Sequence, residues 1–290
     1  MKRFVVGVAA VVAVAVLFGA RPLDPVGADP VRQAVLGRLA AEQAAEADEA
    51  LADAESLMRQ GVVDAGRGQA AILSGPDDPA DHLNLAATWF EAAADPVASG
   101  QAALAALRWT LLALNPTASP PTLALTAVQT QDIGAQWRAA ALPASSLADL
   151  RRSAEESLEA LDDALAAIED GDYDAALEAV AAAEASVEEV RAFNGELATL
   201  PVWIETVDAL LQATGDIARA AQAGDEAGVA AAQAAYDEAA AEAATADQAL
   251  TIALGEAASA TTGPASASSA EALRAVVATR DALAALSILP

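Results

Sequence analysis

The chain of 290 residues has no cysteine, one histidine and few aromatic side chains. Without cysteine it forms no disulfide, has no thiol nucleophile and offers no cysteine for a lipid anchor. Lys2 is the only lysine, so loss of the first residues would exclude Schiff-base and serine–lysine chemistry. A Ser-His-Asp triad would require His82, which we interpret instead as a capping or surface residue at a helix start beside Asp81.

Positive charge is also scarce, with 15 basic against 42 acidic residues and a formal net charge of -27. A surface of this sign repels nucleic acid and anionic lipid headgroups, so we expect no nucleic-acid partner. No glycine-rich nucleotide loop is present, and one histidine without cysteine cannot build a zinc site. We expect no cofactor and no enzymatic activity.

Alanine is the commonest residue, and leucine, valine and isoleucine recur among the alanines at steps of three and four. This spacing places apolar side chains on one face of a helix. Because alanine buries little apolar area, each helix must be long to gain enough stability. The sequence therefore predicts an all-α fold in which alanine-rich antiparallel helical hairpins form a bundle.

Residues 1–28 are predicted to be a signal peptide or an N-terminal membrane anchor. Lys2 and Arg3 precede an uncharged apolar run from Phe4 to Ala20. Small or aliphatic residues at 26–28 suit cleavage, whereas the run is also at the short limit for spanning a bilayer. In either case the remaining chain is expected outside the cytoplasm, extracellular or at the cell envelope.

Residues 29–142 are expected to form an N-terminal helical part. We predict a helix from 31 to about 60, ended by Gly61, and a helix from 123 to 141. Asp78-Pro79 and Asp95-Pro96 each resemble a helix start, with an acidic cap before a proline. They predict two separate helices, at 79–94 and 96–114.

Residues 143–256 are expected to form two long helical hairpins. Gly171-Asp172 interrupts two apolar stripes, and Gly224-Asp225 repeats this signal later in the chain. Glycine closes one helix and aspartate caps the next, so each pair predicts a tight helix–helix turn. The first turn resembles the helix junction of tetratricopeptide repeats, but the 34-residue period of that family does not recur.

The last part of the chain is expected to be less regular. Residues 257–269 are rich in alanine, serine and threonine and contain Gly263-Pro264, which predicts a flexible linker. A C-terminal helix at 270–290 would then dock back onto the bundle through Leu273, Val276 and Val277.

Carboxylates are the remaining candidates for a site. Asp170, Asp172 and Asp174 alternate like the start of an EF-hand loop, and they are our weak candidates for metal ligands. That pattern fails at Ala175 and Ala181, where it requires glycine and glutamate, and a helix turn capped by Asp172 explains the same residues.

We therefore expect an exported, non-enzymatic helical-bundle protein with a structural or partner-binding role at the cell envelope. Its partner would be an envelope or extracellular protein, and it would meet the membrane only through an uncleaved N-terminal segment. One alternative is a divalent-cation-binding protein that uses the 170–174 turn and an acidic row at 155–163. Another is an apolar-ligand carrier with a pocket near Trp89, Trp109 and Trp137.

Overall fold

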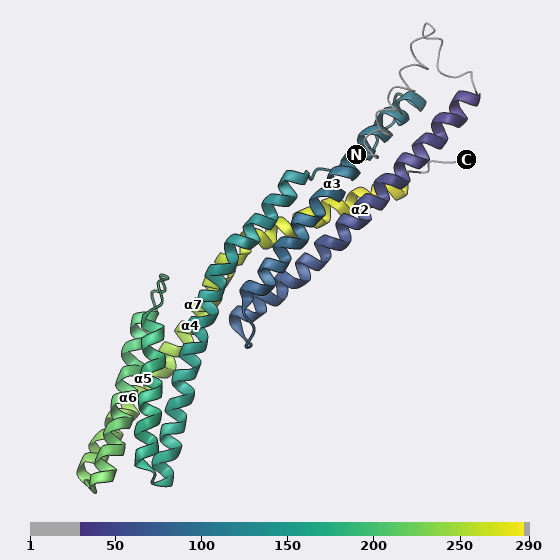
Figure 1. The fold of residues 1–290 in the computed structure, drawn as a ribbon. Helices are drawn as coiled ribbons and strands as arrows, with labels where there is room; N and C mark the ends of the chain where they lie inside the picture. Colours follow the sequence, from purple (N-terminus) through teal and green to yellow (C-terminus); the bar gives the residue numbers. More distant parts are fainter. Residues whose placement is uncertain (1–29, 287–290) are drawn as a thin grey trace.

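The computed structural model describes residues 30–286, which form an elongated all-α bundle of six helices (Figure 1). The predicted leader at 1–28 lies outside the described residues. The helices are α2 (Pro30–Leu73), α3 (Pro79–Leu114), α4 (Ala127–Asp170), α5 (Tyr173–Arg191), α6 (Leu200–Ala223) and α7 (Glu226–Ala285).

Consecutive helices pack against each other as antiparallel neighbours. The last helix, α7, runs back along α6 and then along α4 and α2. At one end of the rod α2, α3, α4 and α7 lie together, and at the other end α4, α5, α6 and α7 do. Helices α4 and α7 therefore belong to both halves and join them.

The two predicted hairpin turns are confirmed. Gly171 and Gly224 adopt left-handed φ values of 78° and 70°, which close α4 and α6. Asp172 and Asp225 follow them, and each side chain accepts from the backbone N–H three residues further on, at 3.1 and 3.0 Å. Satisfying these free N–H groups starts α5 and α7 within one turn.

Two predicted breaks in the N-terminal part are wrong. Pro96 lies inside α3, so the expected helices 79–94 and 96–114 are one helix. Gly61 lies inside α2, which continues to Leu73, because this glycine is a packing residue. A Cβ atom at Gly61 would lie 2.8 Å from the ring of Phe90, so only a hydrogen fits between these helices.

The expected linker at 257–269 is also wrong, since these residues are helical and α7 runs unbroken from Glu226 to Ala285. Residues 270–285 of the predicted C-terminal helix are the last part of that same helix, and residues 287–290 lie outside the described residues. Pro264 is exposed, so its ring points away from the core, and the hydroxyls of Thr262 and Ser269 are buried. Serine and threonine therefore serve here as small core residues.

The boundary expected at Pro143 falls in the middle of α4, where this proline is exposed. Helix α4 begins later than predicted, at Ala127, where Thr126 and Gln129 form a reciprocal capping box. The preceding residues, 115–126, form an extended connection. It is held to the bundle partly by a hydrogen bond of 2.8 Å from Gln101 Nε2 to the carbonyl of Leu125.

Large and small side chains alternate where the helices meet. Gly61 faces Phe90, Gly68 faces Leu83 and Gly100 faces Leu51, and in each case a Cβ would come within 2.8 Å of the larger residue. Steps of three and four between core positions favour side-by-side packing of long helices. In α3 the buried positions with this spacing are Leu83, Ala86, Phe90, Ala93, Val97, Gly100, Leu104, Leu107 and Leu111.

Within residues 30–286, α3 is the helix that is long and apolar enough to cross a bilayer by length and composition alone. It contacts α2 and α4 extensively and buries Leu83, Phe90 and Leu107 completely. About a third of its most apolar stretch, 33 %, is buried in the bundle.

We expect Gly134→Ala to destabilise the fold, because a Cβ there would lie 2.9 Å from the backbone carbonyl of Ala87 on α3. Overpacking of this kind costs about 1–3 kcal/mol. Gly255→Ala is the control, since its Cβ meets nothing within 4 Å and alanine favours helix by about 0.5–1 kcal/mol. Thermal unfolding measures the stability of both variants. An equal change of stability in the two would contradict this packing.

Candidate functional site

The candidate site is a surface groove of about 770 Å³ between α2 and the second half of α7. Its lining is mainly apolar. Residues from three helices contribute, because α4 lies behind α2 and α7 at this level. The lining comprises Arg59, Val62, Ala65, Gly66, Gln69, Trp137, Ser266, Ser269, Ala270, Leu273, Arg274, Val277, Ala278 and Asp281.

The floor of the groove is held by hydrogen bonds between helices. The buried indole of Trp137 donates from Nε1 to Ser269 Oγ at 2.9 Å, which ties α4 to α7. Nearby, Gln69 Nε2 donates to Thr262 Oγ1 at 3.0 Å and to Ser266 Oγ at 3.2 Å, which ties α2 to α7. The hydroxyls that suggested a flexible linker therefore join the three helices.

Two arginines stand at the rim of the groove. Arg59 donates to Glu55 Oε1 from Nε at 2.8 Å and from Nη2 at 2.6 Å. Arg274 donates from Nε to the carbonyl of Ala270 at 3.1 Å and forms no ion pair among residues 30–286. A mainly apolar lining that also includes the guanidinium groups and the carboxylate of Asp281 suits a small amphipathic ligand. The two serines have no histidine or lysine beside them, so the groove lacks an activated nucleophile.

An ion-pair network adjoins the groove. Arg280 on α7 donates to Asp48 Oδ1 at 2.9 Å and to Glu55 Oε2 at 2.6 Å, both on α2. Glu55 is thus shared by Arg280 and Arg59, and its side chain is 14 % exposed. Hydrogen bonds from Arg280 and Arg59 hold the pKa of Glu55 below its ordinary value, although burial opposes them. The network fixes the end of α7 onto α2.

A second arginine fastens the α2–α3 turn to α4. Arg151 is buried, and it donates from Nε to the carbonyl of Ile72 at 3.2 Å and from Nη2 to that of Gly75 at 2.8 Å. A positive charge at carbonyls that end a helix is favourable, because these groups lack helical partners. Arg151 also pairs with Glu155, the first member of the acidic row at 155–163.

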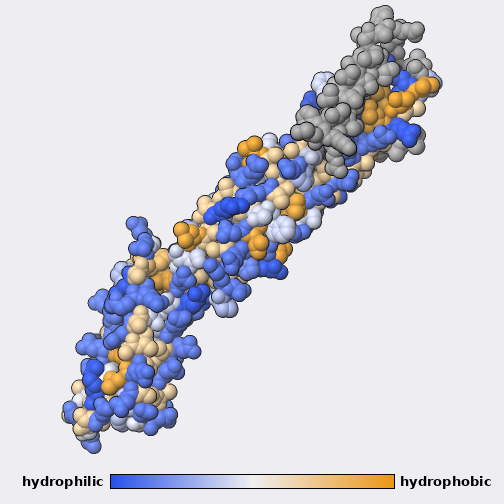
Figure 2. Space-filling model, in the orientation of Figure 1, coloured by the Kyte–Doolittle hydropathy of each residue, from blue (hydrophilic) through white to orange (hydrophobic). Residues whose placement is uncertain are grey.

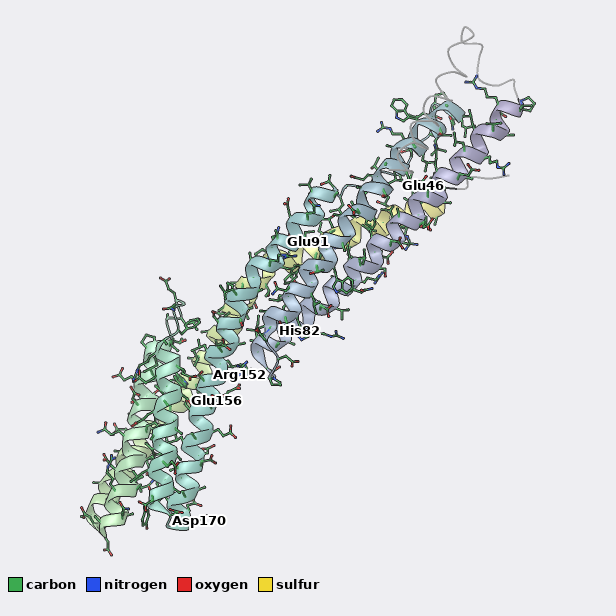
Figure 3. All side chains as sticks on the ribbon, in the orientation of Figure 1. Glu46, His82, Glu91, Arg152, Glu156 and Asp170 are labelled. Atoms are coloured by element: carbon green, nitrogen blue, oxygen red, sulfur yellow. The ribbon has the colours of Figure 1, made fainter. Side chains whose placement is uncertain are left out.

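The weak metal candidates lie at the far end of the rod. Asp170, Asp172 and Asp174 are all exposed, and Figure 3 shows Asp170 at the end of α4. Asp172 caps α5, while Asp174 accepts a hydrogen bond of 2.9 Å from Gln222 Nε2 on α6. In the part of the chain that the structure describes, no three acidic or histidine side chains are grouped so that they could hold a metal ion.

His82 lies at the start of α3, half-buried and 3.9 Å from Asp77 Oδ2 (Figure 3). Its Nδ1 atom is buried and makes no hydrogen bond to the described residues. The expected place at a helix start is confirmed, and no serine hydroxyl is bonded to this ring within residues 30–286.

The three tryptophans expected around one pocket are not brought together. Trp89 donates to Asp64 Oδ2 at 2.8 Å at the α2–α3 interface, and Trp137 is in the core. Trp109 is on the same helix as Trp89 but about 30 Å along it, at 1.5 Å per residue, and is 74 % exposed. Only Trp137 of the three contributes to the groove.

Comparison of the chain with known protein families, with curated proteins and with solved structures gives no match. Its function has to be inferred from its own residues.

We expect Arg151→Ala to lower the free energy of unfolding by about 2 kcal/mol, because hydrogen bonds from a buried charged group are lost. Arg152→Ala is the matched control, since that side chain is 41 % exposed and contacts Asp149 at 3.2 Å. Exposed pairs contribute at most about 1 kcal/mol. Equal effects of the two substitutions in denaturant unfolding would contradict the anchoring role.

We expect the contribution of Glu55 to depend on pH. The ordinary pKa of 4.5 is lowered for Glu55 in the folded protein. The Glu55 carboxylate therefore stabilises the fold at pH values above 4.5, and this contribution is lost as the pH falls through the lowered pKa. Glu55→Gln should therefore reduce the free energy of unfolding at pH 7 and reduce it less at acidic pH. Denaturant titrations over a pH series measure this, and a difference that does not vary with pH would disprove it.

Proposed function

We propose that the protein is an exported, non-enzymatic rod with a structural or partner-binding role at the cell envelope. The observation that carries this proposal is that α4 and α7 run without a break through both halves of the bundle. At 1.5 Å per residue the 60 residues of α7 extend about 90 Å. A single helix packed along its whole length resists bending, which suits a part that holds two sites at a fixed separation.

Two further features support this role. Apolar side chains are buried along the full length of the rod rather than around one enclosed cavity. Most of the acidic side chains are exposed, which favours solubility and discourages non-specific association. Figure 2 shows mostly hydrophilic side chains along the lower half. Placement outside the cytoplasm rests on the leader predicted at 1–28.

The groove at Trp137 favours a second function, binding of a small amphipathic ligand. Its apolar lining and the guanidinium of Arg274 support this alternative, which replaces the pocket expected around three tryptophans. The cation-binding alternative would use the exposed aspartates at 170–174, of which Asp172 and Asp174 already accept hydrogen bonds within the protein. It would also use the acidic row at 155–163, in which Glu155 pairs with Arg151.

The location is tested by placing a single cysteine in the full-length chain, which has none of its own. We expect Glu226→Cys, at an exposed position, to react in intact source cells with a maleimide that does not cross membranes. The unsubstituted chain is the background control. Labelling only after the cells are lysed would contradict export.

The partner-binding role is tested by a photo-crosslinking amino acid at exposed positions on opposite ends of the rod, Thr117 and Glu226. We expect discrete adducts with an envelope or extracellular protein from at least one end. An enzyme would instead turn over a substrate as purified protein and lose this activity on substitution of one acidic residue. That result, or no adduct from either end, would disprove the proposal.

A further inference from the structure

The charge of this protein is unevenly distributed along the rod. No acidic residue occurs at 30–41, at 96–131 or at 282–286, whereas Arg32, Arg38 and Arg108 lie in the first two stretches. Every acidic residue after Asp29 lies at 42–95 or at 132–281. The average charge of the chain therefore hides a positive region beside a strongly negative one.

The fold brings these separate stretches to one end of the molecule. Thr110 Oγ1 donates to Gln43 Oε1 at 2.8 Å, which places the end of α3 beside the beginning of α2. The Thr279 hydroxyl on α7 lies 3.4 Å from the carbonyl of Thr122 in the connection after α3. Figure 1 shows α2 and α3 projecting beyond the end of α7. We call residues 30–41 and 108–114 the basic tip.

The basic tip also exposes large apolar side chains. Val31 is 70 % exposed, Val35 is 55 % exposed and Trp109 is 74 % exposed. Figure 2 shows hydrophobic side chains gathered at this end of the rod, whereas hydrophilic ones cover most of the opposite end. Exposed tryptophan and valine lie beside arginine, and the first carboxylate along α2 is that of Glu42, which lies 3.5 Å from Arg38 Nε. These residues form an amphipathic surface that contrasts with the acidic body.

Among surfaces that could cover this tip, an anionic bilayer has the matching chemistry. Arginines near a membrane surface are attracted to anionic headgroups, and tryptophan favours the boundary between headgroups and acyl chains. The acidic body is repelled by the same headgroups, which would keep the rod pointing away from the bilayer. The apolar run at 4–20 precedes Pro30 by only a short segment, so this end of the rod adjoins the part of the chain suited to a membrane.

We propose that the basic tip is a membrane-docking surface that places Arg38, Arg108 and Trp109 against a bilayer containing anionic phospholipid. The acidic body then extends outward, with the 170–174 turn at the distal end. This inference does not require a protein partner, so it stands or falls separately from the role proposed above.

Single cysteines in the full-length chain test the orientation. Val35→Cys and Val202→Cys carry an environment-sensitive fluorophore at positions of equal exposure, 55 % and 56 %. With vesicles of phosphatidylglycerol and phosphatidylcholine, we expect brighter, blue-shifted emission from position 35 and quenching there by brominated lipid. Position 202 should remain in water. Three results would each overturn the proposal: no emission shift at position 35, an equal shift at both positions, or a shift at position 35 in the absence of vesicles. The last result would indicate that a second copy of the chain covers the tip.

Matched charge variants test the contacts. Arg38→Gln with Arg108→Gln removes two charges from the tip, and Arg152→Gln with Arg219→Gln removes two from the acidic body. Both full-length chains keep the same leader and the same net charge. We expect vesicle flotation to show about tenfold weaker binding for the tip variant and little change for the body variant. Equal binding by the two variants overturns the proposal.

Discussion

Close approach of long helices through small side chains is the constraint on which this structure depends. Alanine and glycine occupy a large share of the core positions, and leucine or phenylalanine from the facing helix fills the space beside Gly61, Gly68 and Gly100. Each such contact contributes little apolar area, so stability has to come from length. This explains why helices of 44 and 60 residues, rather than a compact core, hold the protein together.

The same geometry determines the shape and orientation of the molecule. Because α4 and α7 belong to both halves, the halves cannot turn freely about a linker, and the two ends keep their separation. The ends differ chemically: one carries exposed tryptophan and arginine, and the other carries exposed aspartates. The hydroxyl contacts of Gln69 and Trp137 with α7 strengthen the region between them.

The sequence predicted the helical class, the hairpins and both glycine–aspartate turns, because these depend on local spacing and capping. It failed where a long-range contact decides the outcome. Gly61 looked like a helix end but fits against Phe90, and the serines and threonines at 257–269 looked like a linker but face α2 and α4. The groove was missed because its walls are far apart in the chain. The net charge of the whole chain likewise gave no indication of the basic tip.

The claim that α7 continues through 257–269 is tested most directly by the distance between two spin labels. Ala244→Cys and Glu271→Cys are exposed positions on either side of this segment. A continuous helix predicts one narrow distance distribution near about 40 Å, at 1.5 Å per residue. A broad distribution centred at shorter distances would show that the segment is flexible and would contradict the account of a stiff rod.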